Sequence, residues 1–163
     1  MVSNRIRIGE RLLRLGRLEE ALASFVACIK EAAGAPALFG CAVALHLLER
    51  FDEAELQYER VLAADPKHAE ALANLVALSV ERFDLERVES YARRLLELDA
   101  HSTVALQALV IAAVERREYE IAAQYFSRIR PDAESAGNAI EYRLSPEMVE
   151  RLRSMHGAIA HPY

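Results

Sequence analysis

The chain has 163 residues, a formal net charge of -5 and a pI near 5.6. This length excludes a large multidomain enzyme, and the acidic balance disfavours a general affinity for DNA or RNA, because nucleic-acid binders normally present a basic surface. A content of 53% hydrophobic residues with only 6 glycines and 5 prolines excludes a disordered or collagen-like chain and predicts a sizeable core.

Amphipathic segments follow one another along the first 130 residues and predict an all-α chain. In each segment the apolar residues recur with the spacing of one helix face. Asp65-Pro66 and the stretch from Asp99 to Ser102 supply helix-start signals at two of the boundaries. The expected helices occupy residues 4–15, 18–33, 37–49, 52–64, 67–81, 85–98, 103–115 and 118–130.

A four-residue motif opens every second predicted helix and reveals a repeat. Its copies begin 33, 34 and 34 residues apart and are Leu18–Ala21, Phe51–Ala54, Leu85–Val88 and Tyr119–Ala122. Apolar residues four and seven positions after each copy continue the same helix face. Such a period indicates an array of helix–turn–helix units, in which each unit buries its apolar face against its neighbours.

The repeat resembles the tetratricopeptide repeat. The second unit matches best, because Phe51, Ala54, Tyr58 and the closing Asp65-Pro66 all stand at positions of the family pattern. The resemblance implies an all-α, right-handed α-solenoid of about four tetratricopeptide-like helix pairs plus a C-terminal helix. The array is expected over residues 1–131, with units near residues 2–34, 35–68, 69–102 and 103–131.

Residues 132–163 are expected to form a C-terminal linker and a capping helix. Pro131 stops the last repeat helix, Ser145-Pro146-Glu147 is typical of a helix start, and Gly157 is placed to end this helix. We favour a helix over residues 145–156 that covers the fourth repeat. The alternative is that residues 138–156 fold back into the groove of the array or join a second subunit.

The resemblance implies a concave binding groove formed by the first helix of each unit. Charge is almost absent from its middle, and an exposed apolar surface marks an interaction site. An apolar or amphipathic segment of a partner protein is the expected occupant. The cationic clamp with which some family members hold a peptide carboxylate is missing, since only Asn74 could belong to it. The predicted groove residues are Phe39, Val43, His46, Asn74, Ala77, Gln107 and Ile111.

The sequence has none of the common catalytic motifs. It contains no glycine-rich phosphate loop, no Gly-x-Ser-x-Gly, no Cys-x-x-Cys and no His-Glu-x-x-His. His46 and Glu49 lie one helical turn apart, but a metal site needs about four ligands and no others converge there. Cys28 falls on an apolar helix face and is interpreted as core. We therefore expect no enzyme activity, no catalytic residue, no cofactor and no metal.

The predicted function is a non-catalytic scaffold or adaptor for protein–protein interaction. The alternatives are a self-assembling structural repeat protein, a chaperone similar in size and charge to those of bacterial type III secretion, and an accessory domain of a larger enzyme. Two cysteines cannot make a disulfide framework, and no apolar run is long enough to span a membrane, so a cytoplasmic protein is expected. Residues 1–17 hold five arginines against Glu10 alone; this basic segment is assigned to the first repeat rather than to a membrane-surface or targeting helix.

Overall fold

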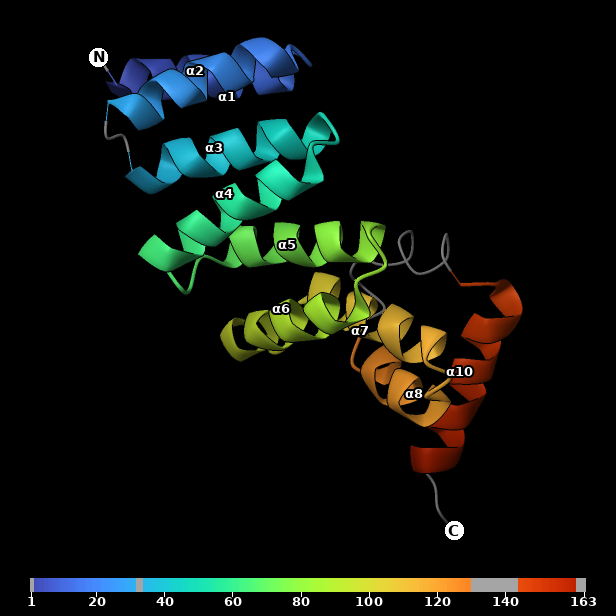
Figure 1. Ribbon diagram of the computed structural model, residues 1–163. Helices are drawn as coiled ribbons and strands as arrows, with labels where there is room; N and C mark the ends of the chain where they lie inside the picture. The colour runs from blue at the N-terminus through green and yellow to red at the C-terminus, as the bar shows by residue number, and fades with distance from the viewer. Residues whose placement is uncertain (1, 32–33, 130–143, 161–163) are drawn as a thin grey trace. The chain divides into compact units, whose positions relative to one another are not determined.

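The structure is a computed structural model that describes residues 2–31, 34–129 and 144–160. All regular structure in these ranges is helical (Figure 1). The chain divides into two units, which we call unit 1 (Met1–Leu78) and unit 2 (Ser79–Tyr163). This division falls inside one helix.

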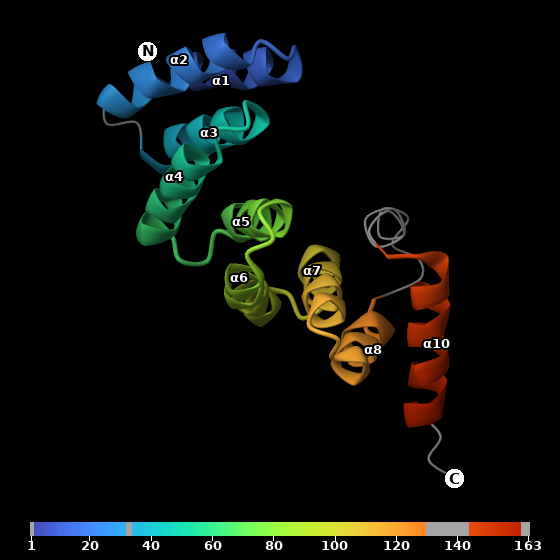
Figure 2. The same ribbon diagram turned by 45° about the vertical axis from the view of Figure 1, so that its right-hand side comes forward.

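Unit 1 contains two complete helix pairs and most of a fifth helix. The first pair is α1 (Val2–Arg14) with α2 (Leu18–Lys30), and the second is α3 (Gly34–Leu47) with α4 (Phe51–Ala64). α5 (Ala69–Glu81) begins in this unit. α2 packs against both α1 and α3, and α3 packs against α4 (Figure 2). The second helix of one pair therefore joins that pair to the next.

Unit 2 continues the same alternation and adds a helix of different origin. Its members are α6 (Leu85–Leu98), α7 (Thr103–Glu115), α8 (Tyr119–Ser127) and α10 (Pro146–Ala160). α7 packs against α6 and α8, and α10 packs against α8 (Figures 1 and 2).

The eight helices expected from the repeat are confirmed, with ends that differ from the prediction by at most three residues. The predicted stop at Gly157 is wrong, because the backbone stays helical to Ala160. Glycine permits the left-handed conformation that ends many helices but does not require it. Its cost inside a helix is about 1 kcal/mol, which neighbouring residues of good helix propensity can offset.

The turn within each helix pair has the same backbone conformation in all four pairs. Gly16, Glu49, Phe83 and Arg117 have left-handed φ angles of 70, 59, 56 and 61°. In every pair the next amide donates a hydrogen bond of 2.8–3.0 Å to a carbonyl five residues earlier. This is the Schellman arrangement that terminates a helix. The sequence repeat is thus also a repeat of backbone geometry.

The ring of Phe25, on α2, fills the space where α1, α2 and α3 meet. Its side chain is fully buried and lies against two glycines, Gly9 on α1 and Gly40 on α3. A Cβ atom added to Gly9 would come within 2.7 Å of the ring carbon Cζ. One added to Gly40 would come within 2.7 Å of Cδ1 and closer still to Cε1 and Cζ. The two glycines therefore make the space that the ring occupies.

α10 packs against α8 through an apolar core. Leu144, Val149 and Leu152 are buried in one cluster with residues of α7 and α8. The Ser145 hydroxyl accepts a hydrogen bond of 3.2 Å from the Met148 amide and so caps the start of the helix. The linker from residue 132 and the first part of the predicted 138–156 segment, residues 138–143, lie outside the described residues.

Candidate functional site

Five rings form a continuous row along α3 and its neighbours in unit 1. Ring centroids lie 5.0 Å apart for His68 and Phe39, 6.0 Å for Phe39 and Tyr58, 6.4 Å for Tyr58 and His46, and 5.9 Å for His46 and Phe51. Tyr58 is only 1% exposed, whereas the other four are half-buried. We call these five residues the ring row. It is anchored in the core and reaches solvent on one side.

The sequence of α3 explains why this surface is apolar. Phe39, Val43 and His46 follow one another at intervals of four and three residues, which places them on one face of the helix. All three are half-buried, and α3 contains no lysine, arginine, aspartate or glutamate. Small buried residues such as Gly40 and Ala44 occupy other sides of the helix and let it approach its neighbours closely.

His68 connects the ring row to the start of α5. Its Nδ1 atom accepts a hydrogen bond of 3.2 Å from the Ala71 amide, so the imidazole acts as a side-chain cap of the helix. The same ring lies over Phe39 with an interplanar angle of 32°. One residue therefore fixes both the helix start and the end of the ring row.

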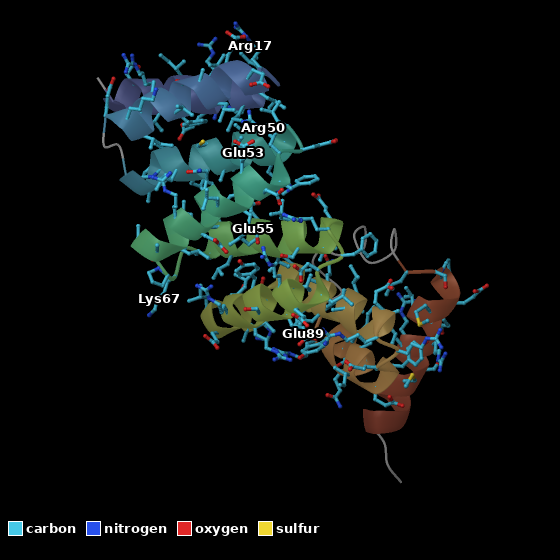
Figure 3. The ribbon with its side chains drawn as sticks, in the orientation of Figure 1. Arg17, Arg50, Glu53, Glu55, Lys67 and Glu89 are labelled. Carbon is cyan, nitrogen blue, oxygen red and sulfur yellow. The ribbon has the colours of Figure 1, made fainter. Side chains whose placement is uncertain are left out.

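A bidentate ion pair lies beside the other end of the row. Arg50 donates from Nε and Nη2 to the two carboxylate oxygens of Glu53, at 2.7 and 2.8 Å (Figure 3). The hydrogen bond from Arg50 lowers the pKa of Glu53. This pair flanks Phe51 at the start of α4, so charge is held at the margin of the apolar surface.

The seven predicted groove residues fall on three helices. On α7, Gln107 and Ile111 are buried, with 7% and 8% exposed surface. The five in unit 1 are half-buried. We call these five the unit 1 face; they are Phe39, Val43, His46, Asn74 and Ala77.

Sequence reasoning missed three members of the ring row as part of this surface. Phe51 and Tyr58 were noted only as positions of the repeat pattern, and Tyr58 is buried. Phe51 opens the motif at the start of α4, which is a usable signal, because a ring at a helix junction can contribute an edge to solvent. His68 stands in the connection before α5, and no periodic signal marks it.

The described residues show no arrangement suited to metal chemistry. No group of three or more histidine, cysteine, aspartate or glutamate side chains in the described ranges could hold a metal ion. Cys28 and Cys41 are both buried as free thiols, and burial raises the pKa of the Cys41 thiol. None of the helices within the described part of the chain combines the length and the apolar character that a membrane span needs.

Solved structures with the same fold are tetratricopeptide repeat proteins. YrrB, described as a TPR protein with an unusual peptide-binding site, shares 19% identity at a TM-score of 0.71, over 95% of this chain and 84% of that chain. MamA from Desulfovibrio magneticus RS-1, from residue 41 to the end, shares 16% identity at a TM-score of 0.78, over 98% and 93%. PilF of Pseudomonas aeruginosa shares 17% identity at a TM-score of 0.73, over 96% and 75%. Identities this low establish the fold alone.

No protein of curated function matches the sequence. Residues 17–127 match the sequence profile of the coatomer epsilon subunit family. The matched region is more than half of the chain, extends from α2 to α8 and includes all four copies of the motif. The chain therefore belongs to the coatomer epsilon subunit family, and its helix pairs are of the tetratricopeptide type.

Proposed function

We propose that this protein is a non-catalytic scaffold that binds an apolar or amphipathic segment of a partner protein on the unit 1 face. The ring row is the observation that carries the proposal. Its members Phe39 and His46 present half-buried rings on α3, a helix without lysine, arginine, aspartate or glutamate. Aromatic side chains provide much contact area and are enriched in protein interfaces.

The spacing of the unit 1 face suits a helical partner. Phe39 and His46 are seven residues apart, which corresponds to roughly 10 Å along the helix axis. A partner helix with apolar residues at i, i+3 or i+4, and i+7 repeats that interval. His46 and Asn74 add hydrogen-bonding groups for polar atoms at its edge. The peptide-binding site described for YrrB, which has the same fold, supports a peptide partner.

The buried cysteines support the non-catalytic and cytoplasmic parts of the proposal. A thiol whose pKa is raised by burial is a poor nucleophile, because the thiolate is the reactive form. Free thiols in the core are also compatible with a reducing compartment. Both observations support a cytoplasmic adaptor as the proposed role.

Affinity capture from the native cell lysate, with identification by mass spectrometry, tests this proposal. Val43→Glu introduces a charge on the unit 1 face, and Val43→Ser is a milder second variant. Ile121→Glu is the matched control, because Ile121 is an exposed apolar residue of α8 in unit 2. Melting curves establish that each variant is folded.

We expect the wild-type protein and the Ile121→Glu variant to capture the same partner and both Val43 variants to lose it. Retention of the partner by folded Val43→Glu would contradict the proposed site. Recovery of only the protein itself, equally with every variant, would support self-assembly instead.

A further inference from the structure

α1 carries a row of arginines on the side that faces away from the core. Arg7, Arg11 and Arg14 are spaced by four and three residues, so they share one face of the helix, and all three are exposed. Gly9, on the opposite side of α1, lies against the buried ring of Phe25. The orientation of the helix in unit 1 is thereby fixed, and the three guanidinium groups point outward. We call them the arginine row.

No ion pair among the described residues of unit 1 accounts for the arginine row. Arg5 pairs with Glu31, Arg17 with Glu20 and Arg50 with Glu53. Among the described residues, by contrast, the three members of the row have no ion-pair or hydrogen-bond partner from a side chain.

Helix stability does not account for the row either. The helix dipole favours Arg11 and Arg14, which lie in the last turn of α1. It does not favour Arg7, and like charges on successive turns repel one another. Glu10 is the only acidic residue of α1. A concentration of unpaired positive charge on one exposed face therefore remains to be explained.

Two exposed apolar side chains border the arginine row. Ile8 is 46% exposed and Leu15 is 60% exposed. Ile8 lies on α1 and Leu15 directly follows its last residue. They are three and four residues from Arg11, so both border it on the same side. The outer face of α1 is thus basic along its middle and apolar along one margin.

We infer that the outer face of α1 binds an acidic amphipathic helix of a partner protein. Carboxylates at i, i+4 and i+7 of such a helix span about 10 Å, the same distance as Arg7 to Arg14. Apolar residues beside those carboxylates meet Ile8 and Leu15. This surface is distinct from the unit 1 face and does not depend on the function proposed for it.

The charge of the remaining chain favours a protein segment over a membrane. Residues 18–78, the remainder of unit 1, contain 4 basic and 10 acidic residues. An anionic bilayer is a broad plane, so it also faces this surplus of acid and is repelled by it. A single helix interacts only with charges within about 10 Å, the screening length at moderate salt. It can contact the arginine row without meeting the acidic surface elsewhere.

Fluorescence anisotropy with two synthetic peptides tests the inference. The first is a labelled helix-forming peptide with glutamates at i, i+4 and i+7 and leucines beside them, and the second has the same composition in an order that puts the glutamates on different faces. The test protein carries Arg7→Gln, Arg11→Gln and Arg14→Gln. The matched control carries Arg93→Gln, Arg117→Gln and Arg153→Gln, three exposed arginines of unit 2. Both proteins lose the same net charge, and circular dichroism checks that they remain folded.

We expect the wild-type protein and the control to bind the first peptide equally and the α1 variant to bind about tenfold more weakly, the order expected when three exposed ion pairs are lost. Binding should weaken as salt is raised, and the reordered peptide should bind more weakly than the first. Equal loss in both triple variants, equal binding of the two peptides, or no binding of the first peptide would overturn the inference. So would binding of phosphatidylserine vesicles in place of the peptide, which would assign the arginine row to a membrane.

Discussion

Replacing Gly40 by alanine would place a methyl group where the ring of Phe25 lies. The added Cβ would come within 2.7 Å of Cδ1 and closer to two other ring carbons, which is shorter than any ordinary van der Waals contact. The ring cannot swing away freely, because it is fully buried and lies so close to α1 that a Cβ atom at Gly9 would come within 2.7 Å of its Cζ atom. The substitution therefore tests whether the two glycines are there to admit the ring.

Two opposing effects set the expected change in the free energy of unfolding for Gly40→Ala. Alanine has a better helix propensity than glycine, which by itself stabilises a helix interior by about 1 kcal/mol. Overpacking a close-packed core costs about 1–3 kcal/mol. Because three ring atoms are affected, we take the upper part of that range and expect net destabilisation of about 1–2 kcal/mol. For a protein of this size, that lowers the melting temperature by roughly 2–8 °C.

A double-mutant cycle with Phe25→Leu isolates the energetic cost of the clash between the added methyl group and the ring. Leucine lacks part of the ring, so Gly40→Ala in that background should become neutral or stabilising, with a coupling energy of about 1–3 kcal/mol. Urea unfolding followed by circular dichroism measures all four proteins. Gly34→Ala is the control, because Gly34 has a φ of 65° and open space around it. This substitution strains the backbone without touching the ring, so it should destabilise the protein equally whether residue 25 is phenylalanine or leucine. A Gly40→Ala protein that melts above the wild type would refute the reasoning.

Further predictions concern unit 2, the pair beside the ring row, and the thiols. Leu152→Ala removes a fully buried side chain between α10 and α8 and should cost about 2–5 kcal/mol in the free energy of unfolding, with faster hydrogen exchange in both helices. Glu53→Gln breaks the pair with Arg50. Since the pKa of Glu53 is lowered in the folded state, its contribution is present above the unfolded pKa and is lost as the pH falls through the folded pKa. The melting temperatures of this variant and the wild type should therefore differ slightly at neutral pH and converge in acid; a difference that persists in acid would contradict this. Cys28 and Cys41 should react with a thiol reagent only at the rate of unfolding, and rapid reaction in the native protein would show that they are accessible.

The helices could be predicted from the sequence because one period governs them. The motif copies at Leu18, Phe51, Leu85 and Tyr119 each begin a helix in the structure. Local signals failed where a residue permits more than one conformation, as at Gly157, through which α10 continues. Four aligned copies of a repeat predict the helices even where one copy departs from the pattern, whereas the prediction of a single helix end depends on one residue.

The site could be predicted only in part, for two physical reasons. α5 has a recognisable face, so the half-buried state of Asn74 follows from its spacing, whereas α3 is apolar on nearly every side and Phe39 was assigned to the groove from the family resemblance. α7 is apolar on nearly every side, from Val104 to Val114, and periodicity cannot tell which of its faces is buried. Phe39 and His68 are far apart in the sequence, yet their rings are in contact. His68 stands in the connection before α5, and the path of that connection cannot be derived from the repeat period.

The shared geometry of the four intra-pair turns has a consequence for how such a gene can change. In each turn one residue with a left-handed φ ends the first helix, and the amide of the next residue makes the same closing hydrogen bond. Recombination between equivalent codons of any two turns would therefore join helix ends that already fit, and would add or delete a whole number of repeats. Lengthening by duplication is then structurally neutral at the junction, and the selective constraint falls on the interfaces between successive pairs, such as the glycine-lined seat of Phe25.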